Sequence, residues 1–132
     1  MANTIPGLNI SVAQYEQVWG KKIRMMVDHY GPATYSNMLT SSGTGDVIHA
    51  SDFNRGGIED AVVTLGGYSQ SGNYYAKAII SAANGMPLGS AAATVTLQWW
   101  TTTAAFGALS AEVTNGSTAL IAENVRLVLT MV

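Results

Sequence analysis

The sequence predicts an all-β fold: an antiparallel β-sandwich or jelly roll of about seven or eight strands, with an extended N-terminal arm. Segments in which apolar and polar residues alternate recur along the chain, and this period of two is typical of half-buried strands. Turn-forming residues separate these segments, and the 132 residues include 14 glycines. No segment shows the apolar spacing of an amphipathic helix, so a helical or α/β fold is not expected.

The chain divides into an arm, residues 1–20, and a β-sandwich domain, residues 21–132, without a linker that would mark a further domain. The arm has weak periodicity and contains the step Pro6-Gly7, which favours an extended conformation. We expect one short helical turn near Ala13–Trp19. The domain begins where regular alternation of apolar and polar residues begins.

The first half of the domain contains three predicted strands, at Lys22–Tyr30, Val47–Ala50 and Ile58–Leu65. Alternation in the first of them places four residues on one face of the sheet, namely Ile23, Met25, Val27 and His29. The third strand is expected to end at Gly66-Gly67, because glycine supplies the positive φ angles that tight turns need.

The second half contains four predicted strands, at Asn73–Ser81, Thr94–Thr103, Leu109–Val113 and Val125–Val132. The second of these has the strongest pattern, because β-branched and aromatic residues alternate along it. Adjacent residues on a strand face opposite sides, so Trp99 and Trp100 cannot share an environment. We place Trp99 in the core with Val95 and Leu97, and Trp100 on the outer face.

The composition excludes several classes of protein. Charged residues make up 11% of the chain, apolar residues 48%, and the net charge is −2, which is unlike a disordered segment. Six basic residues are too few for a non-specific nucleic-acid binder. Between Ala61 and Ala111 the only formal charge is Lys77, but glycine and proline at 85–89 interrupt the apolar runs, which argues against a membrane span.

The best candidate for a metal site is the segment that contains Asp46, His49 and Asp52, with Asp28-His29 upstream. Histidine and carboxylates are the ligands that zinc and iron prefer. On a strand, however, Asp46 and Asp52 face one side and His49 faces the other, and the spacing matches no established ligand pattern. We therefore predict no metal and no cofactor.

No catalytic residues are predicted, so the chain is not expected to be an enzyme. The segment Gly67–Gly72 contains two serines but misses the G-x-S-x-G spacing of a nucleophile elbow and follows no α/β pattern. The adjacent carboxylates Glu59 and Asp60 point to opposite faces of a strand, so they do not form a glycosidase pair.

The scarcity of charge predicts that much of the surface is covered by neighbouring subunits, because interface cores are depleted in charge and enriched in Tyr and Trp. Seven residues are expected to make such contacts: Ile5, Leu8, Tyr15, Trp19, Tyr68, Tyr75 and Trp100. Four of them lie in the arm, whose only charge is Glu16, and we favour docking of the arm on a neighbouring subunit over docking on its own domain.

The segments GGYSQSGNYYAKA (66–78) and TVTLQWW (94–100) resemble the strands of small jelly-roll virion proteins of tailed bacteriophages, of the head decoration or cement type. The resemblance covers residues 58–132 and is one of pattern. The same pattern also resembles carbohydrate-binding jelly-roll modules, in which exposed aromatic rings such as those of Trp99 or Trp100 and Tyr74 or Tyr75 would stack on sugars.

The first resemblance implies a capsid decoration protein that is made in the host cytoplasm and binds the major capsid protein on the surface of the virion. A homo-oligomer is expected, with a trimer favoured, and neither nucleic acid nor membrane is a partner. The alternatives are a carbohydrate-binding or host-attachment protein and another virion component, such as a tail tube or small coat protein.

Overall fold

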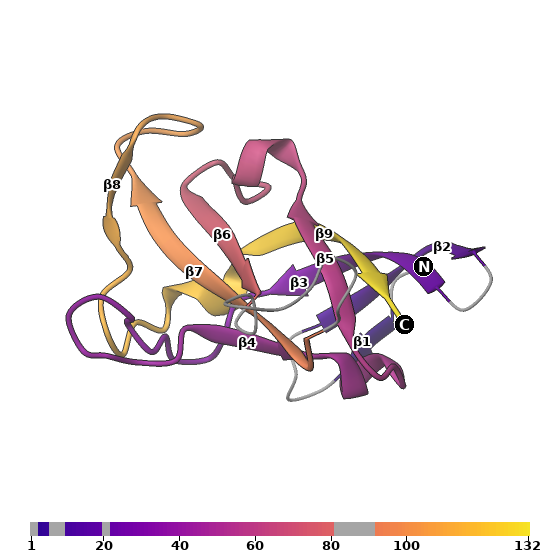
Figure 1. Ribbon diagram of the computed structural model, residues 1–132. Helices are drawn as coiled ribbons and strands as arrows, with labels where there is room; N and C mark the ends of the chain where they lie inside the picture. The colour runs from indigo at the N-terminus through magenta and orange to yellow at the C-terminus, as the bar shows by residue number, and fades with distance from the viewer. Residues whose placement is uncertain (1–2, 6–9, 20–21, 81–91) are drawn as a thin grey trace.

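Two antiparallel β-sheets form the described part of the chain (Figure 1). The apolar side chains between them make one core. The computed structural model describes residues 3–5, 10–19, 22–80 and 92–132, the first two ranges by their backbone. The all-β class expected from the sequence is confirmed by this architecture.

The first sheet has the strand order β1-β2-β3-β9-β5, with β1 at Asn3–Ile5, β2 at Ile10–Trp19, β3 at Lys22–Tyr30, β9 at Asn124–Met131 and β5 at Ile58–Val63. The second has the order β4-β7-β6, with β4 at Asp46–His49, β7 at Thr94–Thr102 and β6 at Tyr74–Ile80. Strand β8, at Leu109–Glu112, also pairs with β7, on the same edge as β4.

The centre of the first sheet is the pair β3 and β9, in which apolar residues alternate with polar ones as the period of two predicts. The inward residues of β3 are all buried: Ile23, Met25, Val27 and His29. They lie beside the buried residues of β9, which are Val125, Leu127, Leu129 and Met131. Alternation along these two strands therefore fixes one wall of the core.

The other wall of the core is β7. Val95, Leu97 and Trp99 are each 0% exposed, whereas Trp100 is partly exposed on the opposite face. The expected assignment of the two tryptophans is thus confirmed. Trp99 has the largest fully buried side chain among the described residues.

The helical turn expected near Ala13–Trp19 is wrong, because these residues belong to β2, which pairs along its length with β3. The register shifts between Val12 and Glu16, so a bulge interrupts the pairing. In one isolated turn of helix, most backbone N–H and C=O groups would have no hydrogen-bond partner. Pairing with β3 supplies such partners, and this tertiary interaction outweighs the helical preference of the local sequence. Residues 1–20 thus contribute two strands to the chain's own first sheet, so the favoured docking of the arm on a neighbouring subunit is wrong: β2 pairs with β3 of the same domain.

Three short 3-10 turns lie in the connections: η1 at Ala50–Phe53, η2 at Leu65–Gly67 and η3 at Ala119–Ala122. Strand β5 ends two residues before the predicted Leu65, because Leu65 and Gly66 both have positive φ and turn the chain into η2. None of the helices in the described ranges is long and apolar enough to cross a membrane.

Candidate functional site

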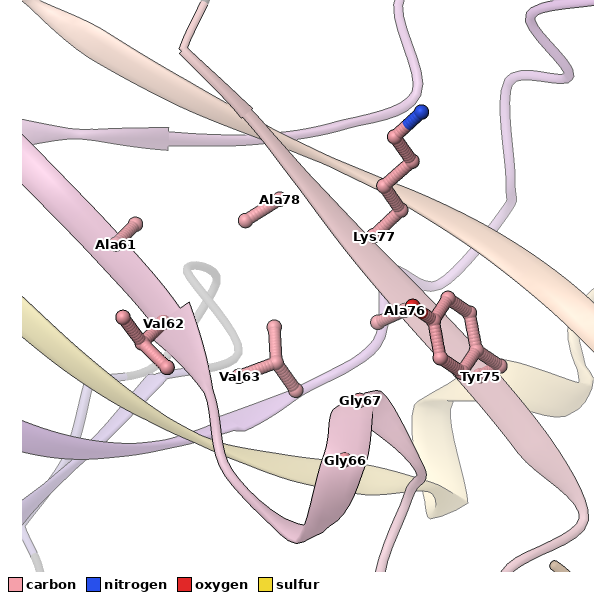
Figure 2. A pocket seen from close by; sticks show the side chains of 9 residues that line it. All are labelled: Ala61, Val62, Val63, Gly66, Gly67, Tyr75, Ala76, Lys77 and Ala78. Atoms are coloured by element: carbon pink, nitrogen blue, oxygen red, sulfur yellow. The ribbon is translucent and has the colours of Figure 1, made fainter.

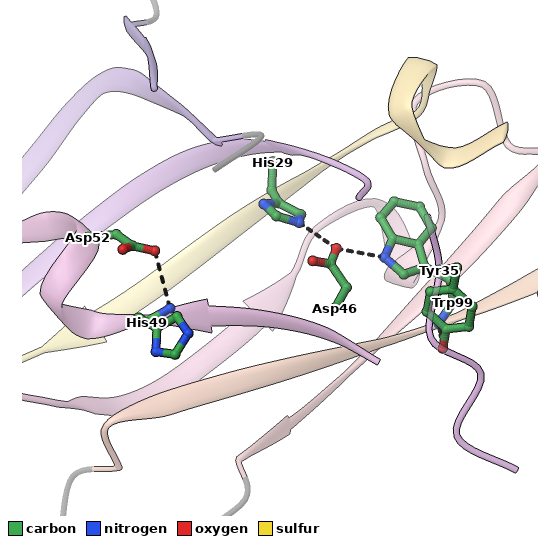
Figure 3. Close-up of polar contacts among 6 residues, drawn as sticks. All are labelled: His29, Tyr35, Asp46, His49, Asp52 and Trp99. Carbon is green, nitrogen blue, oxygen red and sulfur yellow. Dashed lines mark hydrogen bonds and ion pairs between the residues drawn. The ribbon is translucent and has the colours of Figure 1, made fainter. Parts of the chain in front are cut away.

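A polar contact joins the two sheets through the core. His29 on β3 lies with its Nε2 atom 2.6 Å from Oδ2 of Asp46, the first residue of β4, and the indole Nε1 of Trp99 donates to the same oxygen at 3.0 Å (Figure 3). Because a carboxylate only accepts hydrogen bonds, Nε2 of His29 carries the hydrogen. All three side chains are buried, so this contact ties the layers together and offers no accessible reactive group.

Tyr35 fills a gap on one edge of β7. Strand β4 pairs with residues 94–97 and β8 with Trp100 and Thr102, which leaves the backbone N–H of Trp99 without a strand partner. The hydroxyl of Tyr35 accepts a hydrogen bond from that N–H at 3.1 Å and donates one to Oε2 of Glu112 at 2.7 Å. Tyr35 therefore acts in place of a missing strand residue.

The titration of Tyr35 and Glu112 fits a structural role. Burial, with the hydrogen bond to Glu112, raises the pKa of the Tyr35 phenol above its ordinary value. Burial alone would raise the pKa of Glu112, but hydrogen bonds from the backbone N–H groups of Met38 and Leu39 and from Tyr35 hold it below its ordinary value. At neutral pH the two groups are a phenol and a carboxylate, poorly suited to proton transfer.

The candidate metal ligands do not converge. Asp46 points into the core toward His29, whereas His49 is exposed, and Asp52 accepts a hydrogen bond from the backbone N–H of His49 at 3.4 Å (Figure 3). Across the described ranges, no three His, Cys, Asp or Glu residues gather closely enough to hold a metal ion. The contact between His29 and Asp46 could have been suspected from the sequence, since an inward-facing histidine needs a polar partner.

Of the expected contact residues in the arm, Leu8 lies outside the described residues. Ile5, Tyr15 and Trp19 lie in β1 and β2, and their side chains are outside the description as well. Their role in subunit contacts stays a prediction.

The other three expected contact residues come together on the outer face of the second sheet. Tyr75 of β6 lies directly opposite Trp100 of β7, and the Tyr68 ring meets the Tyr75 ring edge-on at 5.5 Å. Phe106, in the loop between β7 and β8, lies 5.6 Å from Tyr68. We call these four residues the aromatic row. Phe106 was missed by sequence reasoning, because a single Phe in a loop has no periodicity to mark it.

Two glycines allow the aromatic row to form. A Cβ atom on Gly67 would lie 2.4 Å from the Tyr75 ring, and one on Gly72 would lie 2.6 Å from the Phe106 ring. Both glycines also have positive φ angles, of 99° and 78°. The rings therefore rest on backbone that only glycine can supply at these positions.

A groove of about 280 Å³ lies between β5 and β6, the outer strands of the two sheets on one side of the molecule. Small apolar side chains line it between the two strands: Ala61, Val63, Ala76 and Ala78 (Figure 2). The lining also includes Tyr75 and the charged residue Lys77 of β6. We call it the edge groove. Beside it, Val62 is 51% and Leu65 50% exposed.

The strand edges that border the edge groove carry backbone groups without a strand partner in the part of the chain that is described. The backbone N–H of Thr64 donates to the carbonyl of Arg126 on β9, so the backbone groups of Thr64 face β9. In an antiparallel pair, successive residues alternately direct their N–H and C=O groups toward the partner strand and away from it. Ala61 and Val63, at odd spacings from Thr64, therefore direct these groups toward the open edge. On β6, the carbonyl of Tyr74 accepts from Ser69, so Ala78, four residues on, also faces away from β7.

Comparison of the chain with protein-family models, with curated proteins and with solved structures gives no match. The arrangement of the described residues, with its open edges, aromatic row and tightly bonded buried polar groups, is therefore the basis for assigning a function.

Proposed function

We propose that this chain is a structural protein that assembles with copies of itself and decorates a phage capsid. The observation that carries the proposal is the edge groove, where two neighbouring strand edges present backbone groups that have no strand partner among the described residues, above a floor of small apolar side chains. Its β-sheets would form a sandwich of the jelly-roll type. The hydrogen bonds that Asp46, Trp99, Tyr35 and Glu112 make support the fold, and Nδ1 of His29 is buried without a partner among the described residues.

Open strand edges favour assembly for a physical reason. An edge strand with free N–H and C=O groups pairs readily with a strand of another chain, and proteins that stay monomeric cover or charge such edges. Here Val62 of β5 and Leu65 of η2 add exposed apolar side chains close to the edge. A strand from a second copy that pairs with β5 would satisfy the backbone and cover apolar surface at once.

The capsid as the larger partner is supported by the resemblance of residues 58–132 to decoration proteins and by the low charge of the chain, 11%. An oligomer that engages several subunits of the major capsid protein binds through many modest contacts, and its avidity then exceeds that of any single contact. We favour a trimer.

The first experiment measures native mass by sedimentation at several protein concentrations. Wild type should be oligomeric, and Ala61→Pro should dissociate it, because proline removes an N–H that faces the open edge without breaking a bond to β9. Val62→Lys, which places a charge on the exposed side of β5, should act in the same direction. Ile121→Lys, at an equally exposed position in η3, is the matched control and should leave the mass unchanged.

The second experiment tests the capsid. Purified protein is mixed with undecorated phage shells and sedimented, and the wild type should pellet with the shells while Ala61→Pro pellets far less. A wild-type chain that is strictly monomeric at high concentration and stays in the supernatant would overturn the proposal. Circular dichroism of each variant verifies that it is folded.

A further inference from the structure

A second hollow lies at the end of β7, separate from the edge groove. It has a volume of about 580 Å³ and is lined by Trp100, by Ala111 and Glu112 of β8, and by the loop segments 37–41 and 114–115. This volume falls within the range of roughly 300–1,000 Å³ that is usual for small-ligand sites. We call this hollow the Trp100 cleft.

The walls of the Trp100 cleft are held by side-chain hydrogen bonds. Oε1 of Glu112 accepts from the backbone N–H of Leu39, and Oε2 accepts from that of Met38, each at 2.8 Å. Asn37 donates to the carbonyl of Val113 at 2.8 Å, and its backbone N–H donates to Oδ1 of Asn115 at 3.0 Å. The loop is thus fastened to β8 before any ligand arrives, which lowers the entropic cost of binding.

The cleft combines one aromatic ring with uncharged polar groups. Trp100 is partly exposed, and the lining also contains the hydroxyl-bearing residues Thr40, Ser41 and Thr114 beside Leu39 and Ala111. The hydroxyl of Thr40 donates to Oδ1 of Asn37 at 2.8 Å. The amide of Asn115 accepts through Oδ1 and donates through Nδ2 to no described residue. The carboxylate of Glu112, the one charged group in the lining, is buried and occupied by its internal donors.

The aromatic surface continues beyond the cleft. Trp100 has Tyr75 as its direct neighbour on β6 and Glu112 as its neighbour on β8. Residues that face each other across two strands have Cβ atoms about 5 Å apart, so the side chains of Trp100 and Tyr75 leave the sheet side by side on the same face. A ligand longer than the cleft can therefore extend from Trp100 onto Tyr75.

From this lining we infer that the Trp100 cleft binds a neutral carbohydrate. A pyranose presents an apolar C–H face that stacks on an aromatic ring, and hydroxyl groups at its rim that exchange hydrogen bonds with amides and hydroxyls. The lining offers both features and has no free charge that would select a phosphate, a carboxylate or an amine. The inference does not depend on self-assembly, because no residue that lines the Trp100 cleft also lines the edge groove, and the two surfaces meet only at Tyr75.

The test titrates the full-length protein with cellohexaose, chitohexaose, xylohexaose and mannohexaose by isothermal titration calorimetry. At least one of these sugars should bind to the wild type. Trp100→Ala should then raise the Kd about tenfold or more, whereas Trp100→Phe, which keeps a stacking surface, should raise it less. Asn115→Asp keeps the oxygen that accepts from Asn37 but removes the Nδ2 donor, so it should also weaken binding.

The matched control is Ile121→Ala, which removes an exposed apolar side chain that does not line the cleft and should leave the Kd unchanged. The inference is overturned if none of the four sugars binds, or if Trp100→Ala and Trp100→Phe both bind as tightly as the wild type. Native mass, measured on the same samples, reports on self-assembly separately, so failure of one proposal is distinguishable from failure of the other.

Discussion

The two faces of β3 hold adjacent polar residues in opposite environments. His29 points into the core and contacts Asp46 on the other sheet, with both side chains buried. Asp28, the preceding residue, points outward and pairs with Arg126 on the neighbouring strand β9 at 2.7 Å. The first contact joins two layers through the protein interior, and the second joins two strands already held by backbone hydrogen bonds.

This difference indicates that buried polar contacts contribute more to the stability of this fold than exposed ones. A buried polar group that loses its partner is destabilised by the full free energy of desolvation. An exposed polar group that loses its partner binds water instead, so its loss is small. Substitutions on the inner faces should therefore be costly, and equivalent substitutions on the outer faces should be mild. Four predictions test this contrast, in order of decreasing effect on the free energy of unfolding.

The largest effect is expected for Trp99→Ala. Trp99 is fully buried, so its truncation leaves a cavity and should cost about 3–5 kcal/mol. The matched variant is Trp100→Ala, one residue along on the outer face, which should spare the fold and act instead on binding or assembly. Urea unfolding measures both, and an equal loss of stability in the two variants would contradict the assignment of faces.

The next largest effect is expected for Asp46→Ala, which removes the acceptor shared by His29 and Trp99. Two buried donors lose their partner, and each buried donor that is left unsatisfied costs about 1–3 kcal/mol. Asp46→Asn keeps an oxygen acceptor and should cost less than Asp46→Ala. Thermal melts of the two variants provide the comparison, and equal destabilisation would mean that the hydrogen bonds contribute little.

A smaller effect, dependent on pH, is expected for Glu112→Gln. Hydrogen bonds to the charged carboxylate are worth about 1.5–3 kcal/mol, and the variant loses this charge assistance. Since the folded-state pKa of Glu112 is below its ordinary value, its stabilisation is complete above the ordinary Glu pKa, about 4.3, and is lost as the pH falls through the folded-state value. Wild type should therefore lose stability between pH 5 and the folded-state pKa.

The measurement for Glu112 is a series of urea unfolding curves from pH 7 to pH 3. The difference in stability between wild type and Glu112→Gln should shrink as the pH falls. A difference that stays constant over this range would show that ionisation of Glu112 does not contribute to stability.

Alternation predicted much of the fold, because a period of two fixes which side of a strand faces the core. It placed Trp99 and His29 inward in advance of the structure. It could not predict that β2 is a strand, since pairing with β3 is a long-range interaction that the local sequence of residues 10–19 does not encode.

The candidate sites were predicted less well than the fold, for the same reason. Tyr75 and Trp100 were singled out by residue type, but their position opposite each other depends on the register of β6 and β7. The edge groove and the Trp100 cleft depend on which strands end a sheet and where the loop at 37–41 is fastened. These are properties of topology, which periodicity does not report.

The smallest effect is expected for Asp28→Asn, on the outer face of β3. The Arg126 guanidinium is largely exposed and retains water when its partner is neutralised, so the loss should be about 0.2–1 kcal/mol. The hydrogen bond with Asp28 raises the pKa of Arg126, which stays protonated in either case, so the effect should not vary between pH 6 and 8. The loss of stability should become smaller as salt is raised to about 1 M, where the Debye length is about 3 Å. Urea unfolding of wild type and Asp28→Asn at low and high salt measures this loss. A loss above about 2 kcal/mol, or a loss that salt does not change, would mean that this outer pair behaves like a buried one and would contradict the contrast between the two faces of β3.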